Sequence, residues 1–177
     1  LAVAQIIQAW SAARQVYTAY GETVQATVIH AAVGRRAFGT SPGEGRVLAT
    51  LRAPEDGVLD DFEQRLRKLA AHTAAAYELE VSFEVTESFP ACTNDPALVG
   101  EIAAIAERAS LHTLEVGRPY AWSEDFGHFS KLCPSVLVGL GAGEGQPVLH
   151  HPHYDFPDDL LPHGVRLLTS IVRAWHG

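Results

Sequence analysis

The sequence predicts an α/β protein made of two parts. Helical and strand periodicities alternate through the first half of the 177-residue chain, and residues 135–140 near its end form a continuous apolar run typical of a strand buried in a parallel sheet. Between them, residues 88–96 are rich in turn-forming side chains. The length suffices for one large domain or two small ones, each with a real core. We expect two domains, at residues 1–90 and 91–177.

Apolar spacing defines the elements of the first part. A recurrence every three or four residues predicts helices, and strict alternation predicts strands. The expected elements are a helix at 1–20 ended by Gly21, strands at 23–29 and 46–52 joined by a glycine-rich loop at 34–45, a helix at 59–76, and a strand at 79–85. One more strand before residue 1 would complete the βαββαβ order of a ferredoxin-like domain. Because the chain also lacks an initiator Met, we expect it to start late, with the first strand missing.

The second part resembles the end of an α/β domain. Asp95 followed by Pro96 predicts a helix N-terminus, with the helix continuing to Ala109. A short strand is expected at 113–116, a polar loop at 122–128 and the apolar strand at 135–140. A final helix places one apolar stripe along its length: Leu161, Val165, Leu168, Val172 and Trp175. The earlier strands of such a domain are not in this chain.

Composition excludes two classes of partner. A net charge of −8 leaves no cationic face for nucleic acid, and no Lys/Arg cluster suggests a membrane surface. The apolar runs are far shorter than the roughly twenty residues that span a bilayer. Two cysteines, Cys92 and Cys133, make no disulfide framework and lack a basic context, so we expect inert packing residues in a cytoplasmic protein.

A histidine-rich loop is the first candidate for chemistry. Residues 149–159 hold three carboxylates and three imidazoles, those of His150, His151 and His153, and they follow the apolar strand. Neutral imidazole is a common zinc ligand, and a strand end holds such ligands rigidly. Near neighbours cannot all reach one ion, so one or two of the three could bind a metal. The alternative is a solvated loop, with Asp158 or Asp159 capping the final helix.

Three further sets of residues each have a functional and a structural interpretation. Glu124 and Asp125 could supply a base or support a metal-bound imidazole, or Ser123 or Asp125 could cap a short helix. Arg52, at a strand end, could clamp a substrate carboxylate or form a surface ion pair. His30 could be an electrophile or a half-buried polar residue. The glycines of 139–145 lack a P-loop lysine and indicate a tight turn.

Taken together, these motifs resemble a known family. The runs at 122–126 (Trp-Ser-Glu-Asp-Phe), 139–143 (Gly-Leu-Gly-Ala-Gly) and 149–156 (Leu-His-His-Pro, then Tyr-Asp-Phe) are similar to the C-terminal end of aminoacylase and hippurate-hydrolase type amidohydrolases, within the dinuclear-metal peptidases. Residues 38–42 and 50–52 stand where that family's lid has an Asn-Val-Ile-Pro turn and a Gly-Thr-Val-Arg strand end. The resemblance covers essentially the whole chain.

The resemblance implies a role for each candidate. Residues 1–90 would be a ferredoxin-like lid, and residues 91–177 the C-terminal part of the catalytic domain. His150 would bind metal, Arg52 would face the substrate carboxylate, and Glu124 and Asp125 would support the site. Gly39 departs from the family's Asn, so a polar lid contact is lost. The family's other metal ligands, its catalytic glutamate and the lid histidine that polarises the scissile carbonyl lie upstream of this chain.

The resemblance also implies an activity. In the complete protein two divalent ions (zinc, manganese, cobalt or nickel) would activate a water that cleaves the amide of an N-acyl amino acid or dipeptide. Family members often dimerise through the lid, so a homodimer is expected. This chain alone, holding one ligand, is expected to be inactive and to bind metal weakly or not at all. The alternative is a non-catalytic binding or assembly module derived from such an enzyme.

Overall fold

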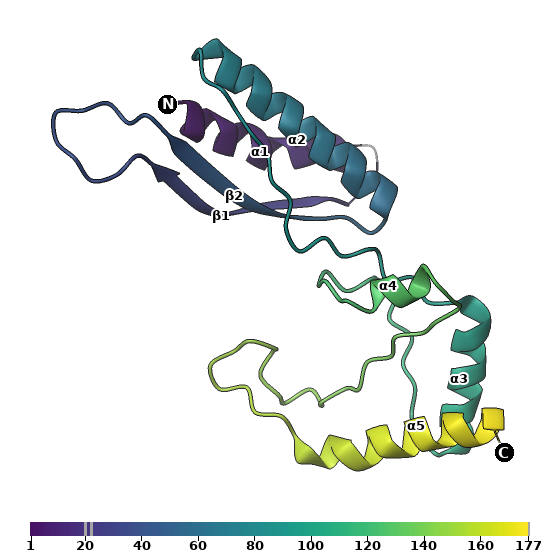
Figure 1. The fold of residues 1–177 in the computed structure, drawn as a ribbon. Helices are drawn as coiled ribbons and strands as arrows, with labels where there is room; N and C mark the ends of the chain where they lie inside the picture. The colour runs from purple at the N-terminus through teal and green to yellow at the C-terminus, as the bar shows by residue number, and fades with distance from the viewer. Residues whose placement is uncertain (20, 22, 177) are drawn as a thin grey trace. The chain divides into compact units, whose positions relative to one another are not determined.

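The computed structural model describes residues 1–19, 21 and 23–176, and the chain divides into two compact units (Figure 1). The first unit comprises Leu1–Ala91 with Tyr120–Ser123, and the second comprises Cys92–Pro119 with Glu124–Gly177. Helices and a two-stranded sheet together confirm the mixed α/β composition that the sequence predicts. In the described part of the chain, no helix combines the length and the apolar character needed to cross a membrane.

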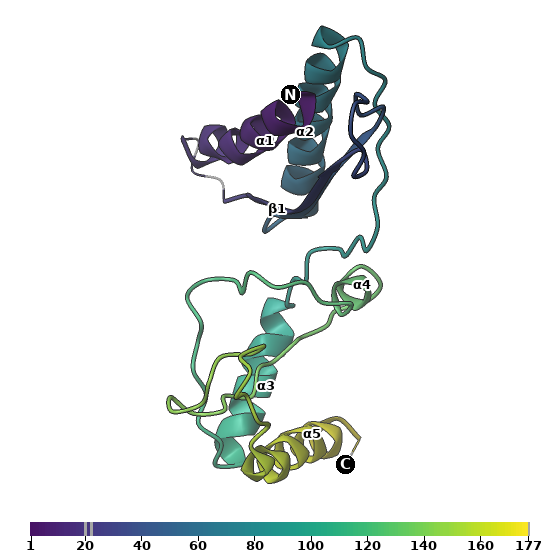
Figure 2. The ribbon, with the colours of Figure 1, turned by 90° about the vertical axis from the view of Figure 1, so that its left-hand side faces the viewer.

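Two helices and a β-hairpin build the first unit. The elements are α1 (Ala2–Ala19), β1 (Gln25–Val33), β2 (Gly45–Arg52) and α2 (Asp56–Ala76). The strands are antiparallel, with Ala26 opposite Leu51, and a bulge interrupts the register between Val28 and His30. Helix α1 packs on both strands and α2 packs on β2 (Figure 2). Apart from Tyr20, which lies outside the described residues, the first helix and both strands confirm the sequence prediction to within a few residues.

The core of the first unit lies between the two helices and the hairpin. Phe62 of α2 is fully buried, and its ring meets that of Tyr17 edge-on with centroids 5.0 Å apart. Ala13, Val24 and Leu66 complete the buried cluster. Burial of aromatic and aliphatic side chains on this scale is the main stabilising contribution to a small unit.

The strand predicted at 79–85 is not formed. The structure assigns no strand there, and its apolar side chains, including Phe83, are about half exposed. The segment nevertheless lies along α2: the Leu79 N–H donates to the Ala74 carbonyl (2.9 Å), and the Arg67 guanidinium lies 4.9 Å from the Phe83 ring centroid. The alternation is therefore present, but a strand exists only where a neighbour accepts its hydrogen bonds, and in the described residues none does.

Two packed helices organise the second unit. Its helical elements are α3 (Pro96–Arg108), the single turn α4 (Gly127–Ser130), the 3₁₀ turn η1 (Asp158–Leu160) and α5 (Leu161–His176). The Asp95 carboxylate accepts from the Leu98 N–H (2.9 Å), which confirms the predicted cap and the Pro96 start. Helices α3 and α5 are joined by a bond from the Trp175 indole to the Glu101 carboxylate (3.2 Å).

The two strands predicted in the second unit are also absent from the described residues. Residues 113–116 and 135–140 are irregular, because no neighbouring strand pairs with them. The final helix is confirmed, but its predicted apolar stripe, apart from Trp175, faces outward: Val165, for example, is 63% exposed, whereas Leu167 on another face is buried. Spacing indicates which residues share a face, and here both faces are apolar, so it could not indicate which one packs on α3.

Candidate functional site

His150 lies in a tight turn with a strained backbone. Its φ is +67°, in the left-handed region that non-glycine residues seldom adopt. Next to it, the His151 N–H donates to the Val148 carbonyl (3.0 Å), and the Tyr154 N–H donates to the His151 carbonyl (2.8 Å). The turn thus places an exposed imidazole on a fixed backbone. Strained residues of this kind cluster at functional sites.

The other two imidazoles of the loop interact with one another. The His153 backbone N–H donates to Nδ1 of His151 (3.1 Å), and the ring centroids are 5.4 Å apart. Nδ1 of His151 therefore accepts this hydrogen bond, and Nε2 takes no part in it. In the described part of the chain no group of three His, Cys, Asp or Glu side chains is placed to hold a metal ion. The three histidines do not converge on one ion.

Glu124 and Asp125 precede α4 and are exposed. Their backbone carbonyls accept from the N–H groups of Gly127 (3.3 Å) and His128 (3.0 Å). Neither Ser123 nor Asp125 caps α4 with its side chain, since the N-cap position is Phe126 and no side-chain cap bond is formed. The capping alternative is therefore wrong, and the two carboxylates project from the turn without a structural task in α4.

Arg52 is the last residue of β2, opposite Gln25 of β1. It is partly buried, and within the described residues its Nε atom is buried without a hydrogen-bond partner. A buried guanidinium donor left unsatisfied costs free energy unless a ligand or water accepts from it. The surface ion pair considered for Arg52 is not formed among the described residues.

His30 and the cysteines differ from the sequence expectation in exposure. His30 follows the bulge in β1 and is exposed rather than half-buried. Cys92 and Cys133 are free and exposed, so they are not the packing residues that we expected. Partial burial, and then the nearby charge of Glu124, raise the pKa of the Cys92 thiol. A raised pKa lowers the thiolate fraction and the reactivity of this cysteine.

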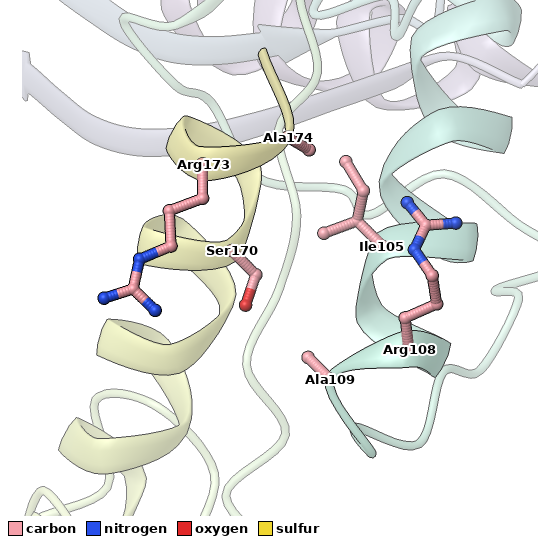
Figure 3. Close-up of a pocket in the computed structure, with 6 residues that line it drawn as sticks. All are labelled: Ile105, Arg108, Ala109, Ser170, Arg173 and Ala174. Carbon is pink, nitrogen blue, oxygen red and sulfur yellow. The ribbon is translucent and has the colours of Figure 1, made fainter. Parts of the chain in front are cut away.

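A shallow pocket of about 200 Å³ lies between α3 and α5 (Figure 3). It is lined by Ile105, Arg108, Ala109, Ser170, Arg173 and Ala174. The two guanidinium groups lie on opposite sides of it and do not converge (Figure 3). Because an anion site needs convergent donors, this pocket is a packing crevice between two helices.

With this geometry in place, comparison identifies the family. The sequence profile of peptidase family M20/M25/M40 matches residues 6–174, nearly the whole chain. The chain belongs to this family, as the motifs at 122–126, 139–143 and 149–156 led us to expect.

Individual relatives are distant in sequence and similar in fold. An uncharacterised hydrolase of Staphylococcus saprophyticus is 26% identical over 143 residues, which are 78% of this chain and 37% of the relative. The YXEP protein of Bacillus subtilis, a dinuclear metal binding peptidase of the M20 family, superposes with a TM-score of 0.78 at 18% identity, over 96% of this chain and 44% of that one. A putative aminohydrolase of methicillin-resistant Staphylococcus aureus gives 0.76 at 22% identity, over 97% and 45%. The chain thus spans less than half the length of each relative.

Proposed function

We propose that this chain is part of a metal-dependent amidohydrolase that cleaves the amide bond of N-acyl amino acids or dipeptides. The observation that carries the proposal is the strained His150, which stands in the third family motif of a chain that belongs to a peptidase family. Glu78, Glu87 and Ser110 share this conformation, so the support comes from a left-handed residue and a family motif coinciding at His150. Zinc, manganese, cobalt or nickel would suit an imidazole ligand.

The described residues do not fit a metal by themselves. His150 offers one ligand, whereas a catalytic site needs about three from the protein, and no group of three is placed together in the described chain. We therefore assign His150 as one corner of the site and derive no reaction step from it. The remaining ligands would belong to other parts of a protein whose solved relatives are more than twice this length.

Arg52 is proposed to bind the substrate carboxylate. A carboxylate accepts two parallel bonds from a guanidinium, and the buried Nε without a partner is one of the donors such a pair uses. Glu124 and Asp125 are proposed to support the histidine ligand through hydrogen bonds or charge, because neither carboxylate is engaged in capping α4.

We further propose that the first unit is the lid, with a ferredoxin-like architecture, and the second unit the C-terminal part of the catalytic domain. The lid would mediate a homodimer through the outer edge of β1, where Ile29 is 64% and Val33 53% exposed and the described residues provide no strand neighbour. A cytoplasmic location is also proposed, since cysteine usage suits a reducing compartment.

Calorimetry with zinc and with manganese tests the ligand assignment on the chain as it stands. We expect weak binding, with a dissociation constant on the order of 1 mM, because one imidazole and its neighbours cannot enclose an ion. His150→Ala should abolish the binding. His163→Ala is the matched control, because His163 is also an exposed histidine but its Nδ1 lies 2.9 Å from the Asp159 carbonyl. Binding that survives His150→Ala would overturn the assignment.

Release of amino acid from N-benzoylglycine tests the incompleteness of the site. With either metal added, the chain should give no turnover. Measurable turnover that depends on His150 would mean that the chain holds a complete site. Tight metal binding without turnover would instead favour the non-catalytic binding module.

A further inference from the structure

Tyr120 and Trp122 form a stacked aromatic pair at the surface of the protein. Their ring centroids are 4.0 Å apart, and the planes of the rings differ by 11°. Stacking covers one face of each ring, yet 56% of Tyr120 and 48% of Trp122 remain exposed. Little else in the described chain therefore covers the outer faces of the two rings. Together the rings form an aromatic platform that is open to a ligand.

Unlike the other two tryptophans, Trp122 does not hold two elements of the fold together. The indole N–H of Trp10 ties α1 to α2, and that of Trp175 ties α5 to α3. Among the described residues, the side chains of Tyr120 and Trp122 form no hydrogen bond, and neither residue belongs to the core cluster. Two neighbouring aromatic side chains that are half exposed and pack on each other are typical of a binding surface.

The loop holds the platform in a form that suits a flat ligand. A bend at Ala121 and Trp122 brings two rings that are two residues apart onto one another, so each ring limits the rotation of the other. A ligand that binds to this surface therefore removes little side-chain entropy from the protein. A planar aromatic ring gains a stacking interaction there, in addition to the burial of its apolar surface.

The platform belongs to the same compact unit as Arg52. Residues Tyr120–Ser123 group with Leu1–Ala91, although the residues on either side of them belong to the second unit. Arg52 is proposed to bind the substrate carboxylate, whereas His150, the proposed metal ligand, belongs to the second unit. The carboxylate is part of the amino-acid half of the substrate. A ring bound in the unit that holds the carboxylate is therefore assigned to that half and not to the acyl group.

We propose that the platform of Tyr120 and Trp122 binds an aromatic side chain on the amino-acid half of the substrate. The ring stacks on an outer face of the pair while Arg52 holds the carboxylate. The preferred substrates are then N-acyl derivatives of phenylalanine, tyrosine or tryptophan. This inference rests on the proposed function and specifies the class of substrate that the same site takes.

Two-dimensional NMR of the full chain tests the platform. The indole N–H signals of Trp10, Trp122 and Trp175 are assigned by replacing each tryptophan with phenylalanine, and the chain is titrated with N-acetyl-L-phenylalanine. We expect the Trp122 signal to shift and the other two to stay in place. N-acetyl-L-cyclohexylalanine has a similar apolar side chain without an aromatic face, so it should bind about three- to tenfold more weakly.

Substitutions in the platform provide the second measurement. Trp122→Leu and Tyr120→Leu should each weaken the binding of N-acetyl-L-phenylalanine about three- to tenfold, as followed by saturation transfer to the ring protons of the ligand. Trp175→Leu is the matched control, because Trp175 is also 48% exposed, and it should leave the affinity unchanged. Circular dichroism establishes that the variants are folded. Equal binding of the cyclohexyl compound, or an affinity that neither platform substitution changes, would overturn the proposal.

Two further ligands identify the half of the substrate that carries the ring. N-benzoylglycine has its ring on the acyl group and should bind at least about threefold more weakly than N-acetyl-L-phenylalanine. N-acetyl-L-phenylalaninamide lacks the carboxylate, so it should bind more weakly than the acid to the unchanged chain and equally to Arg52→Gln. Tighter binding of N-benzoylglycine would overturn the assignment. Metal binding at His150 is measured separately, so failure of the platform and failure of the proposed function give different results.

Discussion

The side-chain amide of Asn94 exchanges two hydrogen bonds with the backbone of Leu137. Its Nδ2 donates to the Leu137 carbonyl (3.1 Å), and its Oδ1 accepts from the Leu137 N–H (2.8 Å). The Asp95 N–H donates to the Ser135 carbonyl (2.9 Å) beside it. The Asn94 side chain thus takes the place of a neighbouring strand for a segment that the sequence predicts to be one.

Asn94→Ala should destabilise the second unit by about 1 kcal/mol, because two exposed hydrogen bonds are lost. Urea denaturation, together with exchange of the Leu137 amide, measures the effect. Asn94→Asp keeps the acceptor for Leu137 N–H but loses the donor, and its charge faces the carbonyl, so it should also destabilise. Unchanged exchange at Leu137 in both variants would show that the pairing does not persist in solution.

Phe62→Ala should lower the free energy of unfolding of the first unit by about 3–5 kcal/mol, since it leaves a cavity at a fully buried position and removes the edge-on contact with Tyr17. A loss of that size approaches the whole stability of a small unit, so α1 and the hairpin should lose their exchange protection together. Phe38→Ala is the matched control, because Phe38 is 92% exposed. Equal effects of the two substitutions would contradict the assigned core.

Trp10→Phe should destabilise the first unit by about 1 kcal/mol. The indole Nε1 of Trp10 donates to the Leu66 carbonyl (3.0 Å), which ties α1 to α2, and phenylalanine keeps most of the packing but not this bond. Thermal unfolding followed by circular dichroism provides the measurement. Trp175→Phe, which removes a comparable indole bond from the second unit, should leave unfolding of the first unit unchanged.

Glu124→Gln should make Cys92 more reactive toward iodoacetamide at about pH 8.5, since the thiolate is the reacting form. The charge of Glu124 is the second cause, after burial, of the raised pKa of Cys92, so its removal lowers that pKa toward the ordinary value of 9.0. The comparison is made in a Cys133→Ser background, with Asp125→Asn as the control. A slower reaction in Glu124→Gln would contradict the cause assigned to the shift.

The same raised pKa has a consequence for stability. The folded chain holds the Cys92 proton to a higher pH than the unfolded chain does, so unfolding releases that proton above about pH 9. The contribution of the protonated Cys92 thiol to the free energy of unfolding is therefore complete below that pH, and it decreases as the pH rises further. Cys92→Ser should reduce this decrease in the free energy of unfolding above about pH 9.

The sequence correctly predicted the elements that local residues stabilise, and it was wrong about the strands that need an adjacent strand to pair with. Helix α3 has its N-cap in the adjacent residue Asp95, and β1 and β2 pair with each other. Both elements are present as predicted. Segments 79–85 and 135–140 have strand patterns but no adjacent strand, which periodicity cannot reveal. Likewise, the motif order identified the family, whereas nothing in it indicated that Asn94 would bind Leu137.

At the candidate site, too, the sequence predicted the residue types but not their arrangement in space. The histidine cluster singled out one loop and the family resemblance singled out His150, but the φ of +67° at His150 is known only from the structure. The pairing of His151 with the His153 N–H likewise depends on a turn that residue types alone do not specify. Convergence of distant ligands is a property of the whole fold, so no count of histidines could establish it.

His150→Gly should make the chain more stable while removing the proposed ligand. Glycine adopts a positive φ without steric cost, whereas histidine at +67° carries strain of about 1 kcal/mol, so the free energy of unfolding should rise by about 0.5–1 kcal/mol, less the entropy that glycine gains when unfolded. His150→Ala keeps the strain and should not stabilise. Urea denaturation of the three proteins, with zinc calorimetry in parallel, measures both effects. If the glycine variant is no more stable than the alanine variant, position 150 carries no appreciable strain in solution, and its backbone conformation no longer supports the assignment of His150 as a ligand.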